Sequence, residues 1–155
     1  MTASNPIQLA LLFRAEVAVA PAVELGAGTI GIRRMVPILA GSFEGPRMKG
    51  TIPAGGADWQ MIRSDGVTEI EAHYTLETED RVIIRVVNRG YRHGPPEVMR
   101  RLALGDPVDP SEYYFRAAPS FEAPLGRYQW LNQHLFVSTG RRLINSVQLD
   151  FYQIL

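Results

Sequence analysis

The sequence contains no cysteine. Disulfide bonds, thiolate nucleophiles and zinc sites with cysteine ligands are therefore excluded. The three histidines, His73, His93 and His134, lack the spacing of a metal site, and the chain has no Gly-x-Ser-x-Gly or His-Glu-x-x-His motif. We accordingly expect no bound metal ion and no cofactor.

Net charge and long apolar runs are also missing. The 16 basic and 16 acidic side chains cancel, whereas proteins that bind nucleic acids or anionic membranes carry a surplus of cations. Arg14, Glu16 or Pro21 interrupts the longest apolar stretches, so none can span a bilayer. The N-terminal residues lack the pattern of a signal peptide. We expect a cytoplasmic protein whose partners include neither nucleic acid nor a membrane.

The 155 residues are most simply one domain, residues 1–155, in which short alternating segments dominate. Alternation of apolar and polar residues with a period of two predicts strands. Residues 95–105 instead have proline at the start, an apolar stripe and a final glycine, which indicates a short helix. Strands are predicted at residues 7–19, 29–39, 59–63, 67–78, from 82 onward, 112–121, 134–139 and 147–154, with turn regions at 64–66, 140–142 and 145–146. Gly31 and Pro37 predict an edge, bulge or bend in the second of these strands.

About eight short strands with one helix indicate an all-β fold, namely an antiparallel closed β-barrel. Closure of the sheet removes exposed edges, and barrels of this size can hold one small ligand, as lipocalins do. A β-sandwich is the alternative. We therefore predict a lipocalin-like barrel with a central cavity and one short helix.

The clearest hairpin signal runs from residue 67 to residue 89. Tyr74 shares one face of the first strand with apolar residues, and Asn88 shares one face of the second. An odd loop, such as residues 79–81, would put these faces together and bring Glu71 and Glu69 near Arg89 and Arg85. A two-residue turn would set Tyr74 opposite Arg85 instead. We predict the odd loop because it keeps the apolar faces on one side.

Residues 44–60 contain four glycines and two prolines and end near the pair Asp58 and Trp59. Glycine permits backbone angles and close approaches that other residues do not. This composition predicts a backbone that bends around something, with an acid and an indole beside it.

Polar residues on apolar faces mark the candidate site. Tyr74 and Asn88 are two of them, and Arg116 shares a face of its predicted strand with Tyr114 and Ala118. An arginine directed into the core needs a carboxylate partner or an anionic ligand, because a buried unpaired charge is costly. Either Asp58 pairs with Arg116, or Arg116 holds a carboxylate, enolate or phenolate of a ligand while Asp58 accepts a proton.

Other residues complete the candidate pocket. Tyr74 and Asn88 either form a structural hydrogen bond or orient a ligand. The tryptophans are core residues or ligand platforms, the segment around Trp130 mixes aromatics with amides as pockets do, and His93 lies in a loop at a candidate pocket mouth. The candidates are Asp58, Arg116 and Tyr74 for catalysis, and Trp59, Asn88, Tyr114, Trp130, Asn132 and His93 for ligand binding.

Several ordered motifs resemble one family over nearly the whole chain, from about Ile7 to the C-terminus. They lie at residues 44–50, 55–60, 74–78, 88–90, 112–116 and 130–132. Together they are similar to the domain of unknown function family 3237, also called uncharacterised protein family 0311. The resemblance implies a small β-barrel and a homo-oligomer. Its barrel is similar in kind to lipocalin-like and allene-oxide-cyclase-like barrels, which is an analogy of fold only.

Three functions fit these observations. The first is cofactor-free acid–base chemistry, as in an isomerase, cyclase or lyase/hydratase, on a carbonyl or phenolic compound: Asp58 would move the proton, and Arg116 would stabilise negative charge. The second is a carrier or sensor that binds a small ligand in the same pocket. The third is a structural or oligomeric barrel filled by side chains, which a cavity no larger than roughly 300 Å³ would favour.

Overall fold

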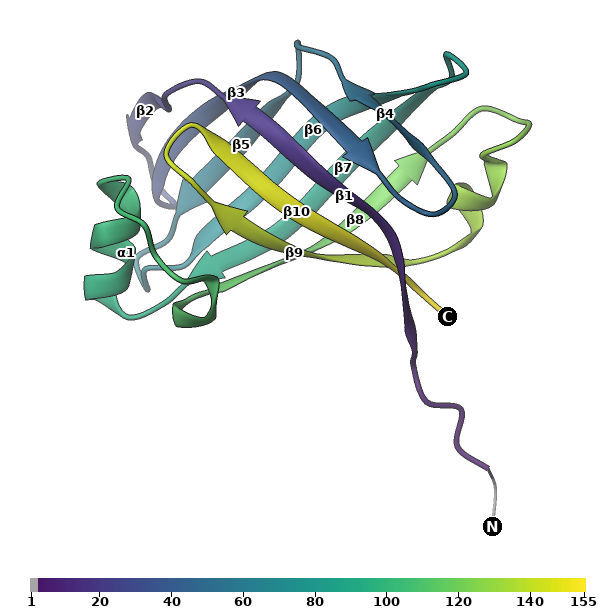
Figure 1. Ribbon diagram of the computed structural model, residues 1–155. Coiled ribbons are helices and arrows are strands. Elements are labelled where there is room, and N and C mark those ends of the chain that lie inside the picture. Colours follow the sequence, from purple (N-terminus) through teal and green to yellow (C-terminus); the bar gives the residue numbers. More distant parts are fainter. Residues whose placement is uncertain (1–2) are drawn as a thin grey trace.

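The computed structural model describes residues 3–155, and within them alternating residues form the strands of one sheet (Figure 1). The strands are β1 (Leu9–Val19), β2 (Val23–Ala27), β3 (Ile32–Glu44), β4 (Lys49–Ile52), β5 (Ala57–Ile62), β6 (Thr68–Thr78), β7 (Ile83–His93), β8 (Tyr114–Glu122), β9 (Phe136–Arg142) and β10 (Ser146–Ile154). The helix α1 (Pro96–Ala103) follows β7, and two 3-10 turns, η1 (Pro110–Glu112) and η2 (Gln129–Gln133), flank β8.

The sheet closes on itself. Strands pair in the order β1, β10, β9, β8, β7 and β6; β4 and β5 then each pair with both β6 and β3, and β3 pairs with β1. Because β4 and β5 share one place in this circuit, the barrel has eight strand positions. All pairings are antiparallel, so the predicted closed antiparallel barrel is confirmed and the β-sandwich is not observed.

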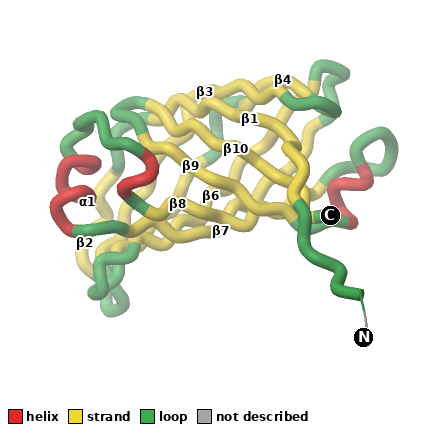
Figure 2. Tube along the Cα trace, turned by 60° about the horizontal axis from the view of Figure 1, so that its bottom comes forward, coloured by secondary structure: helices red, strands yellow, loops and turns green. Residues whose placement is uncertain are grey.

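One half of the barrel interior is solid. Phe13 packs against Phe43, Phe121 and Phe151 with ring centroids 4.5 to 6.2 Å apart, and Phe121 packs edge-on against Phe136 at 4.9 Å. Such offset and edge-to-face arrangements add to the stability that burial of these rings provides. The other half contains a cavity lined by apolar and polar side chains. Figure 2 shows α1 and β2 together at one end of the barrel.

The predicted hairpin is confirmed as β6 and β7. The Thr78 amide donates to the Val82 carbonyl at 2.9 Å around the turn, and Glu71 lies opposite Arg89, whose Nε donates to Glu71 Oε1 at 2.5 Å. The second predicted pair is wrong. Arg85 lies opposite Thr75 and not near Glu69, and its side chain contacts Glu122 on β8 at 3.4 Å instead.

Some strand boundaries differ from prediction for identifiable reasons. Pro37 marks where β3 exchanges β5 for β4, beside an irregularity in its pairing with β1, as the predicted bend implies. A second irregularity in β1 falls between Leu11 and Phe13, so Leu12 and Phe13 are both buried. The turn predicted at residues 140–142 is wrong, because these residues extend β9 and the turn follows them.

The glycine-rich segment, residues 44–60, forms the tight connections around β4. A Cβ on Gly56 would lie 2.5 Å from the Tyr74 Cβ, so only glycine lets this turn lie against β6. Strands β2 and β4 were not predicted. All five residues of β2 are exposed, and an exposed strand has no alternation to detect.

The predicted helix is confirmed as α1. Its first turn carries Glu97, its last turn carries Arg100 and Arg101, and Val98 and Leu102 are buried. The helix lies at the hollow end of the barrel (Figure 1). No helix within residues 3–155 is long and apolar enough to cross a membrane.

Candidate functional site

A cavity of about 110 Å³ occupies the hollow end of the barrel. This is below the roughly 300 Å³ at which ligand pockets usually begin, and near the size of apolar cavities of about 150 Å³ that take up benzene. It suits one ring or a short chain. The lining residues are Val17, Val19, Ala20, Pro21, Ala22, Val36, Ile38, Asp58, Gln60, Ile70, Ala72, Tyr74, Asn88, Arg92, Phe115, Arg142, Leu143, Ile144, Val147 and Leu149.

Strand register aligns the central polar residues. Asp58 on β5 lies opposite Ala72 on β6, and Ala72 lies opposite Asn88 on β7. The side chains of these three residues line the cavity from adjacent strands, and the single methyl group of Ala72 leaves space between the two polar groups. Tyr74 follows Ala72 on the same face of β6. The structure thus places Asp58, Tyr74 and Asn88 around one cavity.

The Asp58 carboxylate is held on one side only. Its Oδ2 accepts a 2.6 Å hydrogen bond from Gln60 Nε2, and Gln60 Oε1 accepts one of 2.7 Å from Arg34 Nε. Its Oδ1 is enclosed and has no hydrogen-bond partner within residues 3–155. Burial raises the pKa of Asp58 above its ordinary 3.8. The Gln60 hydrogen bond, the charge of Arg92, the backbone at Glu71 and the charge of Arg34 oppose this. A carboxylate whose pKa is raised is a stronger proton acceptor than an ordinary one.

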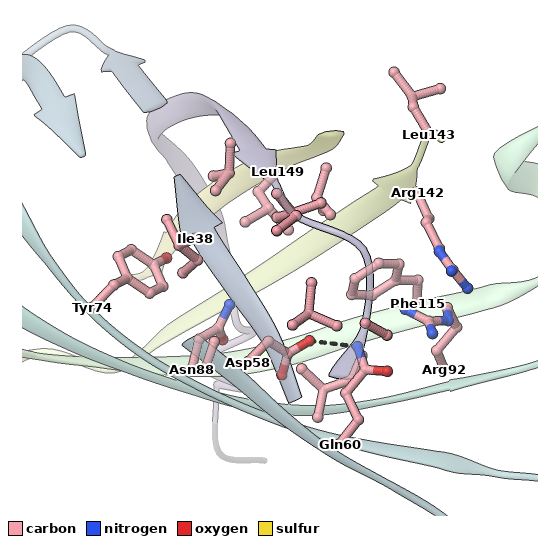
Figure 3. A pocket seen from close by; sticks show the side chains of 18 of the residues that line it. Ile38, Asp58, Gln60, Tyr74, Asn88, Arg92, Phe115, Arg142, Leu143 and Leu149 are labelled. Atoms are coloured by element: carbon pink, nitrogen blue, oxygen red, sulfur yellow. Dashed lines mark hydrogen bonds between the residues drawn. The ribbon is translucent and has the colours of Figure 1, made fainter. Parts of the chain in front are cut away.

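Tyr74 and Asn88 line the cavity on the side of Asp58 that is away from Arg92 and Arg142 (Figure 3). Asn88 is 4% exposed, and its Oδ1 has no hydrogen-bond partner in the described part of the chain. Burial, and secondarily the Asp58 charge, raise the pKa of Tyr74, so its phenol remains protonated and can donate a hydrogen bond. Asp58, Tyr74 and Asn88 thus offer one proton acceptor and two orienting groups.

Two arginines occupy the other side of the cavity. Figure 3 shows Arg92 and Arg142 beside Phe115, with Asp58 between them and Tyr74. Arg92 is 2% exposed, its guanidinium lies 5.4 Å from the centre of the Phe115 ring, and its Nε has no hydrogen-bond partner within residues 3–155. Burial, followed by the charges of Arg142 and Arg34, lowers the pKa of Arg92. An arginine pKa starts so far above 7 that the side chain stays charged.

The predicted inward orientation of Arg116 and Tyr114 is wrong. On β8, Phe115 and Ala117 are buried and Arg116 points outward, where its Nη1 donates to the Phe115 carbonyl at 2.9 Å. Tyr114 is exposed and stacks on His93, with ring centroids 4.9 Å apart. Asp58 and Arg116 therefore do not form a pair.

Arg92, which was not among the predicted site residues, is the arginine buried in the core. It lies opposite Phe115 on β8, and it continues the inward face of β7 that holds Ile84, Val86 and Asn88. That continued alternation, four residues past Asn88, was the signal that could have identified it.

The remaining candidates lie away from the cavity. Trp59 is 44% exposed, because its neighbour Asp58 points inward and successive residues of a strand face opposite sides. Trp130 lies in η2, near the far end of β8, where Arg47 covers its ring at 3.7 Å. Asn132 exchanges two hydrogen bonds with the backbone of Ala123, at 2.8 and 2.9 Å, and so fixes that loop.

His93 lies outside the barrel with Tyr114, and His73 contacts Glu71 on the outer face at 3.3 Å. Within residues 3–155 no three side chains of His, Asp or Glu gather closely enough to hold a metal ion.

Residues 7–154 match the family described as "Protein of unknown function (DUF3237)", and the chain belongs to this family, as the sequence motifs indicated. A UPF0311 protein from Rhodopseudomonas palustris (strain TIE-1) is 43% identical over 125 residues, which are 81% of this chain and 82% of that protein. The crystal structure of a beta-barrel like protein from Acinetobacter baumannii AYE shares 41% identity and a TM-score of 0.87, covering 100% of both chains.

A more distant structure belongs to an enzyme from Penicillium herquei. It is 24% identical, with a TM-score of 0.74, and the match covers 100% of this chain and 99% of that one. At this identity the likeness shows a shared fold and nothing about activity.

Proposed function

We propose that the cavity binds a small molecule with a carbonyl or phenolic group, and that Asp58 transfers a proton to or from it without a cofactor. One observation carries this proposal: Asp58 Oδ1, Asn88 Oδ1 and Arg92 Nε are enclosed, lack hydrogen-bond partners within residues 3–155, and belong to side chains that line one cavity. Buried polar groups are nearly always paired, and each unpaired one costs about 1–3 kcal/mol. A ligand with matching polar atoms would remove that cost.

The arrangement suits proton transfer next to a carbonyl group. The Asp58 carboxylate would take a proton from the adjacent carbon, and the C–H electron pair would form the C=C bond of an enolate. Negative charge would move to the carbonyl oxygen, where an arginine or the Tyr74 phenol stabilises it. In a substrate whose enolate is conjugated with a second C=C bond, return of the proton from Asp58 to the far carbon of that system regenerates the carboxylate and gives an isomer. Cyclase and lyase/hydratase reactions can begin with the same step.

A barrel filled by side chains is the second candidate, and the cavity volume of about 110 Å³ favours it. The enclosed unpaired atoms oppose it, because a filled structural interior normally satisfies its polar groups. A carrier or sensor would bind the same ligand without the proton transfer.

Hydrogen–deuterium exchange tests the proton transfer without knowledge of the natural substrate. Cyclohexanone, a neutral ring ketone, is incubated with the protein in D₂O, and loss of its α-proton signal is followed by NMR. We expect the protein to accelerate exchange and Asp58→Asn to lower the acceleration about 10²- to 10⁴-fold. Asp65→Asn is the matched control, because Asp65 lies in an exposed turn, paired with Arg63, and should retain the acceleration.

Binding without exchange would support a carrier or sensor and contradict the catalytic role of Asp58. If cyclohexanone neither binds nor exchanges, the filled structural barrel is supported instead.

A further inference from the structure

One side of the cavity holds more positive charge than the protein neutralises. Arg92 and Arg142 line the cavity, and Arg34 lies behind Gln60, to which its Nε donates at 2.7 Å. Asp58 is the one carboxylate among the lining residues. The three guanidinium groups are close enough that each of Arg142 and Arg34 lowers the pKa of Arg92.

These arginines differ from several on the outer surface that pair with acidic side chains. Arg89 pairs with Glu71 at 2.5 Å and Arg101 with Glu112 at 3.0 Å, although water could solvate both. Within residues 3–155, by contrast, neither Arg92 nor Arg142 forms a salt bridge with an acidic side chain, although Arg92 is 2% exposed. A buried cation without a partner is costly, so an unpaired arginine cluster in a cavity indicates an anion that comes from outside the protein.

We propose that the ligand of this cavity is a small organic carboxylate, whose carboxylate group binds Arg92 and Arg142 while its apolar body lies against Ala72. This inference rests on the proposed function, because it uses the same cavity. The planar guanidinium fork matches a carboxylate better than any other protein group does, and the Phe115 ring fixes the Arg92 side chain from one side.

The positions of the other polar groups set the ligand's orientation. Asp58 repels a carboxylate, which leaves the arginine side as the favoured place for it. The other end of the ligand then lies toward Tyr74 and Asn88, which can hold a carbonyl or hydroxyl group (Figure 3). The carbon atoms between these two ends lie next to Asp58. The substrate class is therefore a carboxylate that bears a second oxygen function on a ring-sized apolar body.

Benzoate and benzamide form a matched pair of probes, because they share size and shape and differ in charge. The ¹⁵N-labelled protein is titrated with each, and dissociation constants are obtained from shifts of the amide and arginine side-chain signals. We expect benzoate to bind at least 10-fold more tightly than benzamide, with shifts at Arg92 and Arg142.

Arg142→Gln should weaken benzoate binding at least 10-fold and leave benzamide binding unchanged. It suits the test better than a change of Arg92, because Arg142 is only half-buried and its replacement leaves the core intact. Arg141→Gln removes the same charge from the neighbouring residue, which is exposed on the outer face of β9, and should change neither affinity by more than about twofold. Thermal unfolding verifies that both variants are folded.

Equal affinity for the two probes in the wild-type protein would overturn the carboxylate assignment and leave the proposed function standing. If Arg142→Gln and Arg141→Gln weaken benzoate binding equally, the carboxylate assignment is also overturned, because long-range charge would then explain the binding. If neither probe changes any signal of the cavity residues, both this inference and the proposed function are wrong.

Discussion

Replacement of Asp58 by asparagine should make the folded protein more stable at neutral pH. The change keeps the size of the side chain and an oxygen that can accept the 2.6 Å hydrogen bond from Gln60, but it removes a charge enclosed in the cavity wall. Burial is the largest influence on the Asp58 carboxyl group and outweighs the attraction of Arg92 and Arg34, so its pKa is raised. The wild-type protein therefore gives up stability to keep this carboxylate ionised.

The sign and size follow from proton linkage. Because the folded pKa lies above the ordinary 3.8, protonation of Asp58 stabilises the folded state. That contribution is fully present below about pH 4 and is lost as the pH rises through the folded pKa. Each unit by which the folded pKa differs from the unfolded pKa corresponds to about 1.4 kcal/mol of free energy of unfolding. We expect Asp58→Asn to raise the free energy of unfolding at pH 7 by about 1.4 kcal/mol for each unit by which the folded pKa exceeds the unfolded one, and each kcal/mol to raise Tm by about 2–4 °C in a chain of this length.

Circular dichroism melts at pH 3.5, 5 and 7 provide the assay. The Tm of Asp58→Asn should match that of the wild type at pH 3.5 and exceed it at pH 7. Asp65→Asn is the control with the opposite sign, because its hydrogen bonds to Arg63 lower the pKa of Asp65, so this variant should gain nothing at pH 7. A lower Tm for Asp58→Asn at pH 7 would refute the reasoning, since attraction to the arginines would then outweigh burial.

Two further predictions concern the two halves of the interior. Ala72→Leu places three more carbons between Asp58 and Asn88 and should weaken binding of benzamide at least 10-fold. Its effect on the free energy of unfolding should stay within about 2 kcal/mol, because strain of about 1–3 kcal/mol opposes a gain of about 0.8 kcal/mol per buried CH₂. If an NMR titration shows unchanged benzamide binding, the ligand lies elsewhere. Phe151→Ala should cost about 3–5 kcal/mol, or roughly 10 °C in Tm, because Phe151 is fully buried against Phe13. A loss below about 1 kcal/mol in a denaturant melt would contradict the description of this half as solid.

The barrel could be predicted from the sequence because period-two alternation is a local property. In β6 every second residue is buried from Thr68 to Thr78, so the pattern and the structure coincide. The odd turn at residues 79–81 followed from the same pattern, and it correctly placed Tyr74 and Asn88 on the inner face. Asp58 was identified from its setting in a glycine-rich turn segment, which the structure places beside the cavity.

Arg116 could not be placed from its own strand. Both faces of β8 carry an aromatic residue and an alanine: Tyr114 and Ala118 on one side, Phe115 and Ala117 on the other. Alternation alone therefore does not tell which face is buried. The pairing with β7, which sets Phe115 opposite the buried Arg92, decides it, and this contact joins residues far apart in the sequence.

The charged cluster was missed for a related reason. Arg34, Arg92 and Arg142 lie on three strands, β3, β7 and β9, and their proximity depends on closure of the barrel. No spacing within a single segment indicates such a cluster. By contrast, the bend at Pro37 was visible in the sequence because proline limits strand pairing wherever it occurs.

A crystal structure of the protein grown with benzoate would test the central claim most directly. The account predicts benzoate in the cavity, with its carboxylate within hydrogen-bond distance of Arg92 or Arg142 and its ring beside Ala72. Benzoate found only on the outer face of the barrel, or a cavity closed by the side chains of its lining residues, would contradict it.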